Sequence, residues 1–221
     1  MEISERARLA NQSLWEQSFN HPFVQEIRDG SLALDKFRFY VKQDAYYVRE
    51  FAKIHGLAAA QADDPKIVAA LSDIAVGLAE GELQMHRRFF ADLQVGGEEW
   101  AAFRPAPAAY AYIAHLYCVV CQGRLCRTMA ALLPCPWLYS EIGQRLKNAA
   151  PKREIFQNWI AEYSSDALEK NVAVERKIWD KLSRGADDHE KERMLHIFYQ
   201  SSYYELNFWD MSYGMDDWNR K

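Results

Sequence analysis

The spacing of apolar residues constrains the fold of this chain more than any other feature. Apolar residues recur every three or four positions, and no stretch alternates apolar with polar residues as a half-buried strand would. The seven prolines divide this pattern into segments, because proline suits the start of a helix and disrupts its interior. The pattern therefore predicts an all-α fold, a multi-helix bundle. The expected helices span residues 4–19, 22–28, 34–61, 65–93, 107–131, 136–148, 153–163, 166–183 and 187–214.

The chain shows no sign of division into parts. No linker is long or biased enough to separate domains, and there is no repeat or low-complexity tract. Hydrophobic residues make up 49% of the sequence, which is ample for a core. We therefore expect one all-helical domain over residues 1–221.

The termini and the cysteine content predict a cytoplasmic protein. The N-terminal residues include acids and lack the apolar segment of a secretory signal. The sequence contains no run of about 18 apolar residues, so we expect no transmembrane helix. Four cysteines without an export signal favour reduced thiols. The net charge of −4 and the lack of a basic stripe argue against a nucleic-acid partner. We expect neither a membrane nor a nucleic acid as partner.

One predicted helix carries a carboxylate on its apolar face. Asp44 is the only acid on a face that it shares with these residues: Phe37, Tyr40, Val41, Tyr47, Val48 and Phe51. A carboxylate is costly to ionise in such surroundings unless something pairs with it. Either it hydrogen-bonds to a neighbour and holds helices together, or it faces a pocket and binds a donor-rich ligand.

The last predicted helix repeats this arrangement. Glu205 is the only acid on a face formed by Phe198, Ser201, Ser202, Phe208, Trp209 and Ser212. The small serines beside it predict open space. Two inward carboxylates on two helices favour a polar pocket over two unrelated structural contacts.

A cysteine lies between two prolines in the run Leu132 to Tyr139. Pro136 suits the first position of a helix, which would place Cys135 at or next to its N-cap. The positive end of the helix dipole favours the thiolate, which is the nucleophilic form. The alternative is a buried, inert cysteine.

The other possible metal ligands do not form a convincing site. Cys118 and Cys121 lie in a predicted continuous helix, where we expect them to pack rather than bind metal. Glu82 and His86 are one residue further apart than the Glu-x-x-His spacing of di-iron bundles. We expect His86 to make a structural hydrogen bond, and we expect no metal and no cofactor.

Four motifs in order resemble the TenA family, also called thiaminase II or aminopyrimidine aminohydrolase, in its cysteine-containing branch. They are Gln43 to Tyr47, Leu132 to Tyr139, Tyr163, and Ser201 to Trp209, and the likeness runs from about residue 4 to about residue 214. The resemblance implies a haem-oxygenase-like helical fold without haem and a cytoplasmic homotetramer. It implies hydrolysis of 4-amino-5-aminomethyl-2-methylpyrimidine to the 5-hydroxymethyl compound and ammonia, in thiamine salvage. It also implies cleavage of thiamine to hydroxymethylpyrimidine and a thiazole alcohol.

The resemblance assigns a role to each matching residue. Cys135 would be the nucleophile that adds to the pyrimidine ring, and Glu205 the acid and base at the departing group. Asp44 would hold the amino group and ring nitrogen of the pyrimidine. The remaining substrate-binding residues would be Tyr47 beside the thiol, Tyr139, Tyr163, and the ring-stacking walls Tyr112 and Phe208.

Two other function classes stay open on the sequence alone. A non-catalytic regulatory or ligand-binding protein would show an exposed basic or apolar patch, and none is visible. A metal-dependent oxidase on a similar scaffold would need several inward Glu and His side chains. None of the six histidines can be placed beside Asp44 or Glu205 from the sequence.

Overall fold

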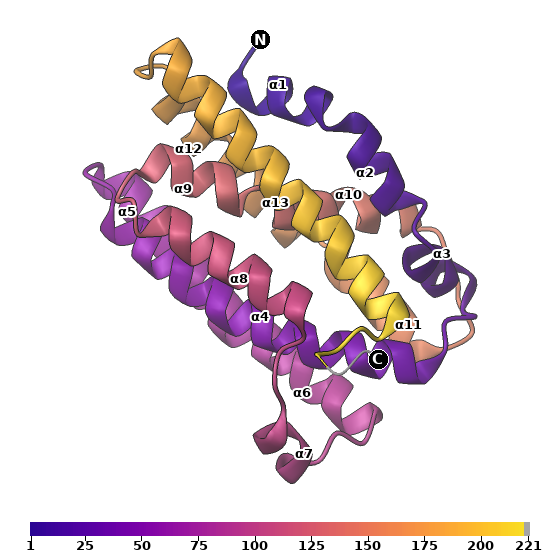
Figure 1. Ribbon diagram of the computed structural model, residues 1–221. Coiled ribbons are helices and arrows are strands. Elements are labelled where there is room, and N and C mark those ends of the chain that lie inside the picture. Colours follow the sequence, from indigo (N-terminus) through magenta and orange to yellow (C-terminus); the bar gives the residue numbers. More distant parts are fainter. Residues whose placement is uncertain (219–221) are drawn as a thin grey trace.

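The computed structural model describes residues 1–218, apart from the side chains of Glu82 and Leu83, and all regular elements in this range are helices (Figure 1). The prediction of an all-α fold is confirmed. Two 27-residue helices, α4 (Leu34–Ala60) and α13 (Asp188–Gly214), run the length of the molecule. Helices α8 (Pro107–Val120) and α9 (Leu125–Leu132) lie between them, and both contact α4 and α13.

The other helices complete the bundle around this centre. Their bounds are α1 Ile3–Ala10, α2 Gln12–Phe19, α3 Pro22–Asp29, α5 Pro65–Gly77, α6 Leu83–Asp92, α7 Gly97–Ala102, α10 Pro134–Leu146, α11 Glu154–Tyr163 and α12 Asp166–Ser183. A π-helical turn, Leu78–Glu82, joins α5 to α6. Helix α10 packs against α11, α12 and α13.

Several helix ends follow from local sequence chemistry. Pro65 is the first residue of α5, and the Asp64 side chain accepts a hydrogen bond from the backbone N–H of Lys66. Helix α13 begins in the same way, because the Asp187 side chain accepts from the N–H of Glu190. Helix α3 ends at Gly30, whose positive φ of 76° is the left-handed conformation that favours glycine.

Three predicted helices are interrupted in the structure. The segment 4–19 divides at Asn11, and 65–93 contains the π-helical turn. The segment 107–131 breaks after Val120, where Gly123 adopts a φ of 67°. Apolar periodicity continues through each break, so spacing alone does not reveal them. Helix α7 was missed, because its six residues are too few to show a period.

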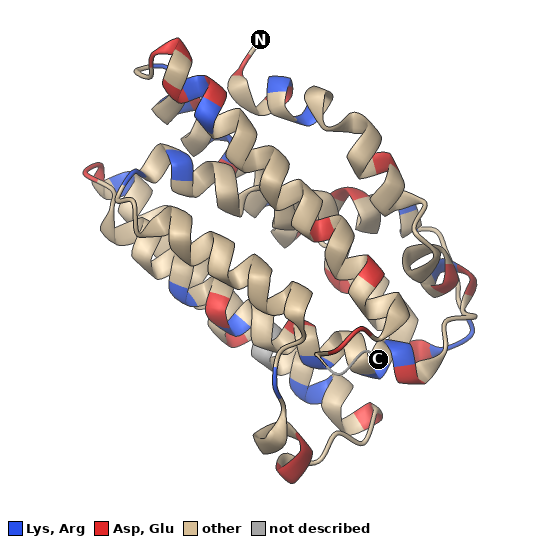
Figure 2. Cartoon of the chain, in the orientation of Figure 1, with Lys and Arg blue, Asp and Glu red and all other residues tan. Residues whose placement is uncertain are grey.

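The interior is dominated by aromatic and aliphatic side chains. Helix α8 contains no Lys, Arg, Asp or Glu, and its ribbon is uncharged along its whole length in Figure 2. Four tryptophans are fully buried: Trp15, Trp159, Trp179 and Trp209. Across the described residues, no helix combines the length and apolar character needed to span a lipid bilayer.

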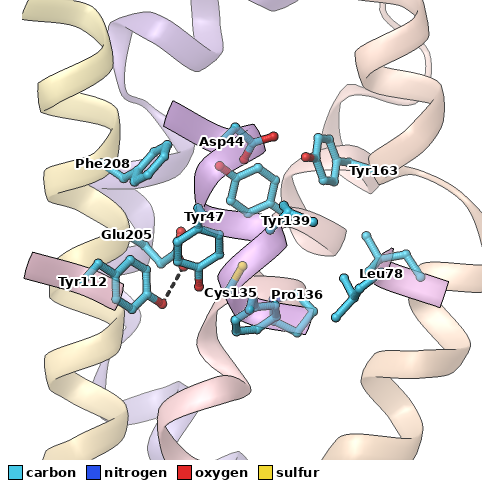
Figure 3. Close-up of a pocket in the computed structure, with 13 residues that line it drawn as sticks. Asp44, Tyr47, Leu78, Tyr112, Cys135, Pro136, Tyr139, Tyr163, Glu205 and Phe208 are labelled. Atoms are coloured by element: carbon cyan, nitrogen blue, oxygen red, sulfur yellow. Dashed lines mark hydrogen bonds between the residues drawn. The ribbon is translucent and has the colours of Figure 1, made fainter. Parts of the chain in front are cut away.

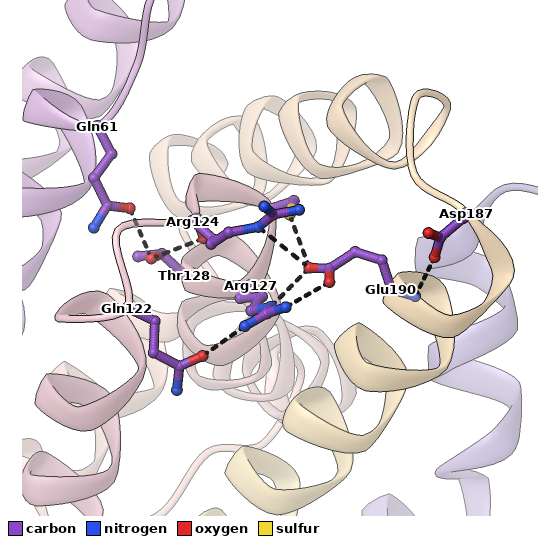
Figure 4. A network of polar contacts seen from close by, with 8 residues as sticks. Gln61, Gln122, Arg124, Arg127, Thr128, Asp187 and Glu190 are labelled. Carbon is purple, nitrogen blue, oxygen red and sulfur yellow. Dashed lines mark hydrogen bonds and ion pairs between the residues drawn. The ribbon is translucent and has the colours of Figure 1, made fainter.

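A partly buried ion pair joins α9 to the start of α13 (Figure 4). The Arg127 guanidinium donates two hydrogen bonds to Glu190, at 2.7 Å to Oε1 and 2.6 Å to Oε2. This bonding lowers the pKa of Glu190 to about 2. The Cys126 thiol also donates to Oε1 of Glu190, at 3.5 Å. Bidentate geometry of this kind fixes the relative position of the two helices.

The prediction that Cys118 and Cys121 pack inside a continuous helix is wrong. Both side chains are exposed, and Cys121 is the C-cap of α8. The break at Gly123 turns the chain before α9 begins, which leaves this end of α8 at the surface.

Helices α10 and α11 approach most closely at Gly143. A Cβ atom on this residue would lie 2.1 Å from the carbonyl oxygen of Tyr163 and 2.5 Å from the nitrogen of Ser164. Both are backbone atoms, which cannot rotate away as a side chain does. Only glycine therefore lets the end of α11, with Tyr163, sit against α10.

We expect Gly143→Ala to destabilise the protein by about 1–3 kcal/mol, because overpacking costs more than the gain in helix propensity. Gly56 of α4 is the matched control, since a Cβ there would meet nothing within 4 Å. Gly56→Ala should raise stability by about 0.5–1 kcal/mol. Urea unfolding of both variants tests this, and equal effects on stability would contradict the steric explanation.

Candidate active site

All eight site residues predicted from the sequence line one cavity (Figure 3). The cavity and its open mouth together hold about 500 Å³ of empty space. The eight residues come from five helices. Asp44 and Tyr47 lie on α4, Tyr112 on α8, Cys135 and Tyr139 on α10, Tyr163 at the end of α11, and Glu205 and Phe208 on α13. Five further residues complete the described lining: Val48, Phe51, Leu78, Pro136 and Leu168.

Cys135 lies in the first turn of α10. The helix begins at Pro134, two residues earlier than predicted, with Leu133 as N-cap, so Cys135 is just inside the helix. Leu133 itself has helical backbone angles, and α9 therefore leads almost directly into α10. The thiol is half-buried, is in no disulfide, and points into the cavity (Figure 3).

Glu205 faces Cys135 from α13 and is buried. The Tyr112 hydroxyl donates a hydrogen bond to its Oε1 at 2.7 Å. Burial raises the pKa of Glu205 to about 8, while hydrogen bonds from Tyr112 and Cys135 act in the opposite direction and the charge of Asp44 adds to the rise. A carboxylic acid with a pKa in this range can both hold and release a proton near neutral pH, as acid–base catalysis requires.

The Tyr47 hydroxyl points toward Cys135 (Figure 3). It is buried, and no described residue gives it a hydrogen bond of standard geometry. Burial raises the pKa of Tyr47 well above its usual value, with the charge of Cys135 as the next cause. Tyr47 is thus a neutral phenol, and the Tyr112 hydroxyl lies close enough to affect its pKa.

A tyrosine wall closes another side of the cavity. The rings of Tyr139 and Tyr163 lie 4.6 Å apart. Behind them, Tyr40 donates to the Tyr139 hydroxyl at 3.4 Å and accepts a hydrogen bond from the Trp159 indole at 3.2 Å. Burial raises the pKa of Tyr139 well above its usual value. This packing holds the wall rigid and keeps Tyr139 uncharged.

His86 is a site residue that sequence reasoning did not place. Its Nε2 lies 2.8 Å from Oδ2 of Asp44, and both side chains are only 4% exposed. The expected structural hydrogen bond of His86 exists, but its partner is the inward carboxylate. The only available signal was the unpaired acid on α4, which required a partner somewhere in the chain. Glu82, which was considered together with His86 as a possible metal ligand, has a side chain outside the described part of the structure.

The serines beside Glu205 do not leave space for a ligand, as their small size had suggested. The Ser202 hydroxyl accepts a hydrogen bond from the Trp15 indole at 3.0 Å, and Ser201 lies 3.0 Å from Nε2 of His115. Both serines are fully buried against these larger side chains. Their small size allows Trp15 and His115 to pack against α13.

The described residues contain no group of three or more His, Cys, Asp or Glu side chains arranged to hold a metal ion. What they do bring together is a thiol, a carboxylic acid with a raised pKa, and a second carboxylate paired to histidine. That set supplies a nucleophile, an acid–base group and an anchor for N–H donors.

Comparison with known proteins gives consistent results. The model of the TENA/THI-4/PQQC family matches residues 9–215. An aminopyrimidine aminohydrolase of Bacillus subtilis is 40% identical over 219 residues, which cover 99% of this chain and 93% of that protein. The structure of a TenA homologue from P. horikoshii OT3 superposes with a TM-score of 0.89 at 27% identity, covering 97% of this chain and 99% of that one.

A more distant likeness concerns the fold alone. A domain from Shewanella denitrificans described as having a haem-oxygenase-like fold gives a TM-score of 0.71 at 16% identity, covering 96% and 91% of the two chains. The expected haem-oxygenase-like fold is therefore confirmed.

Proposed function

Because the chain belongs to the TENA/THI-4/PQQC family, we propose that it is an aminopyrimidine aminohydrolase of thiamine salvage. Its substrate would be 4-amino-5-aminomethyl-2-methylpyrimidine, and its products the 5-hydroxymethyl compound and ammonia. The observation that carries the proposal is the convergence of Cys135, Glu205 and Asp44 on one cavity walled by tyrosines.

The first half of the reaction forms a bond to sulfur and releases the amine. Asp44 accepts a hydrogen bond from the amino group of the pyrimidine and lies beside the adjacent ring nitrogen. The Cys135 sulfur bonds to the ring as its proton passes to the ionised form of Glu205, a form that a pKa of about 8 keeps accessible near neutral pH. The addition removes the aromaticity of the ring. Glu205 then gives that proton to the amine, and the carbon–nitrogen bond breaks to leave an exocyclic methylene group.

The second half adds water. Water attacks the methylene carbon while Glu205 takes one of its protons. The carbon–sulfur bond then breaks, the ring regains its aromaticity, and the proton returns to the thiol. Water and substrate thus give ammonia and the alcohol, with Cys135 and Glu205 restored.

The test is ammonia release from the aminomethyl pyrimidine by the purified protein. Release with formation of the hydroxymethyl compound supports the proposal. A folded protein that releases no ammonia overturns it. In that case metal analysis separates the two remaining classes, since stoichiometric iron would favour an oxidase and its absence a ligand-binding protein.

A second pocket favours thiamine as an additional substrate. It adjoins the cavity through four shared residues: Phe51, Leu78, Pro136 and Leu168. Its described lining includes Glu162 and Glu175 but no lysine or arginine. This space suits a leaving group larger than ammonia, and its carboxylates suit the positive charge of a thiazolium ring.

We expect Ala167→Trp to separate the two reactions. Ala167 lines only the second pocket, in the first turn of α12. An indole there should reduce thiamine cleavage about tenfold or more, because it fills the leaving-group space, while ammonia release stays near the wild-type rate. Ala173→Trp, on an exposed position of the same helix, is the control. Equal loss of both reactions would place the leaving group elsewhere.

The homotetramer stays a prediction of the family resemblance, and the cytoplasmic location and the absence of a nucleic-acid partner stay predictions from the sequence. Sedimentation of the purified protein tests the first of these directly.

A further inference from the structure

The pairing of Asp44 with His86 is the only contact of a cavity-lining carboxylate with a histidine among the described residues. Oδ2 of Asp44 and Nε2 of His86 are 2.8 Å apart, and no lysine or arginine in the described part of the chain forms an ion pair with Asp44. Asp44 lines the cavity, whereas His86 does not. His86 therefore reaches the site only through Asp44.

Buried side chains of α6 on either side of His86 fix the position of this part of the helix. Met85 and Phe89 are both 2% exposed. The Phe89 ring packs edge-on against Phe37 of α4 at 5.6 Å. Because Phe37 and Asp44 lie on the same face of α4, this contact brings His86 level with the carboxylate.

The chemistry of the two side chains indicates which atom carries the hydrogen between them. A carboxylate only accepts hydrogen bonds, so Nε2 of His86 must carry the hydrogen between them. That bond occupies one lone pair of Oδ2 and leaves Oδ1 to a molecule in the cavity.

We propose that His86 is a positioning residue for substrate recognition, acting through Asp44. It holds the carboxylate in one orientation, so that the free oxygen can accept from the amino N–H of an aminopyrimidine edge. The inference rests on the proposed function for the identity of that ligand.

Three variants test the role of the Nε2 donor. In His86→Leu the donor is removed, and in His86→Asn the amide is too short to reach Asp44. In His86→Gln the amide nitrogen can take the place of Nε2. We expect KM for the aminomethyl pyrimidine to rise about tenfold or more in the Leu and Asn variants, with a smaller change in kcat. The Gln variant should recover most of the affinity.

His21 provides a control. Its Nε2 lies 3.2 Å from Oδ1 of Asp210, His21 is buried, and neither residue lines the cavity or the second pocket. His21→Leu removes a histidine–aspartate hydrogen bond away from both, so it should lower the unfolding temperature without changing KM. The inference is overturned if KM in His86→Leu, or in His86→Asn should leucine prevent folding, equals that of the wild type or of His21→Leu. Failure of the Gln variant to recover affinity also overturns it.

Calorimetric binding of the hydroxymethyl pyrimidine separates this inference from the proposed function. If the wild type binds the alcohol but releases no ammonia, the hydrolase proposal fails. The His86 variants then decide the inference from their affinities alone. If the wild type binds neither compound, both proposals are overturned.

Discussion

Replacing Cys135 by serine is expected to lower ammonia release by roughly three orders of magnitude or more while leaving the fold intact. The hydroxyl is close to the thiol in size and can occupy the same place in the first turn of α10. It is a far weaker nucleophile, because an alcohol holds its proton much more tightly than a thiol. Glu205, with a pKa of about 8, is matched to a thiol and not to an alcohol.

Single-turnover assays with purified Cys135→Ser measure this loss, and circular dichroism reports the fold. Cys126→Ser is the control, since Cys126 is also half-buried but contacts Glu190 of α13 and does not line the cavity. It should turn over at the wild-type rate. Wild-type turnover by Cys135→Ser would show that no bond to sulfur forms.

Replacing Glu205 by glutamine is expected to abolish turnover and yet make the protein more stable in mildly alkaline solution. Turnover is lost because the amide cannot carry a proton to the departing amine. Stability changes because burial raises the pKa of Glu205 from 4.5 to about 8. Glutamine has no charge to bury, and its carbonyl oxygen can still accept the hydrogen bond from Tyr112.

The pH dependence gives this prediction its sign. The pKa of Glu205 is 4.5 in the unfolded chain and about 8 in the folded protein. Between these values the folded protein keeps a proton that the unfolded chain releases, so wild-type stability falls as pH rises from 4.5 to about 8. The loss amounts to a few kcal/mol at about pH 9. Glu205→Gln should therefore exceed the wild type most at about pH 9 and match it near pH 4.

Urea unfolding at several pH values measures the difference. Glu190→Gln is an internal contrast, because hydrogen bonding to Arg127 lowers the pKa of Glu190 to about 2. The Glu190→Gln protein should be less stable than the wild type at neutral pH, where the Glu190 carboxylate is paired with Arg127. Its stability should approach that of the wild type only in acid. A Glu205→Gln protein that is less stable than the wild type at every pH would contradict the buried-acid explanation.

The sequence was informative where a single helix carries the signal. Asp44 and Glu205 each interrupt an otherwise apolar face, and a period of 3.6 residues is enough to show that both point inward. The proline pair around Cys135 likewise marks a helix start within two residues of its true position. These features are local, so no knowledge of neighbouring helices is needed to see them.

Contacts between distant segments were not predictable in this way. His86 meets Asp44 across 42 positions of sequence, and the π-helical turn before α6 changes which face the following residues present. The serines at 201 and 202 look like open space until Trp15 and His115 are seen to fill it. Gly143 shows no special sequence context, although the approach of α11 depends on it.

The distribution of the eight candidate site residues over five helices has a consequence for how activity is acquired. Asp44 and Phe208 lie far apart in the chain, and the other contributing helices are α8, α10 and α11. A partly folded chain that lacks any one of these helices has no closed cavity and no paired thiol and acid. Regain of turnover during refolding therefore reports the docking of the last helix, and a nascent chain stays inactive until α13 has been made.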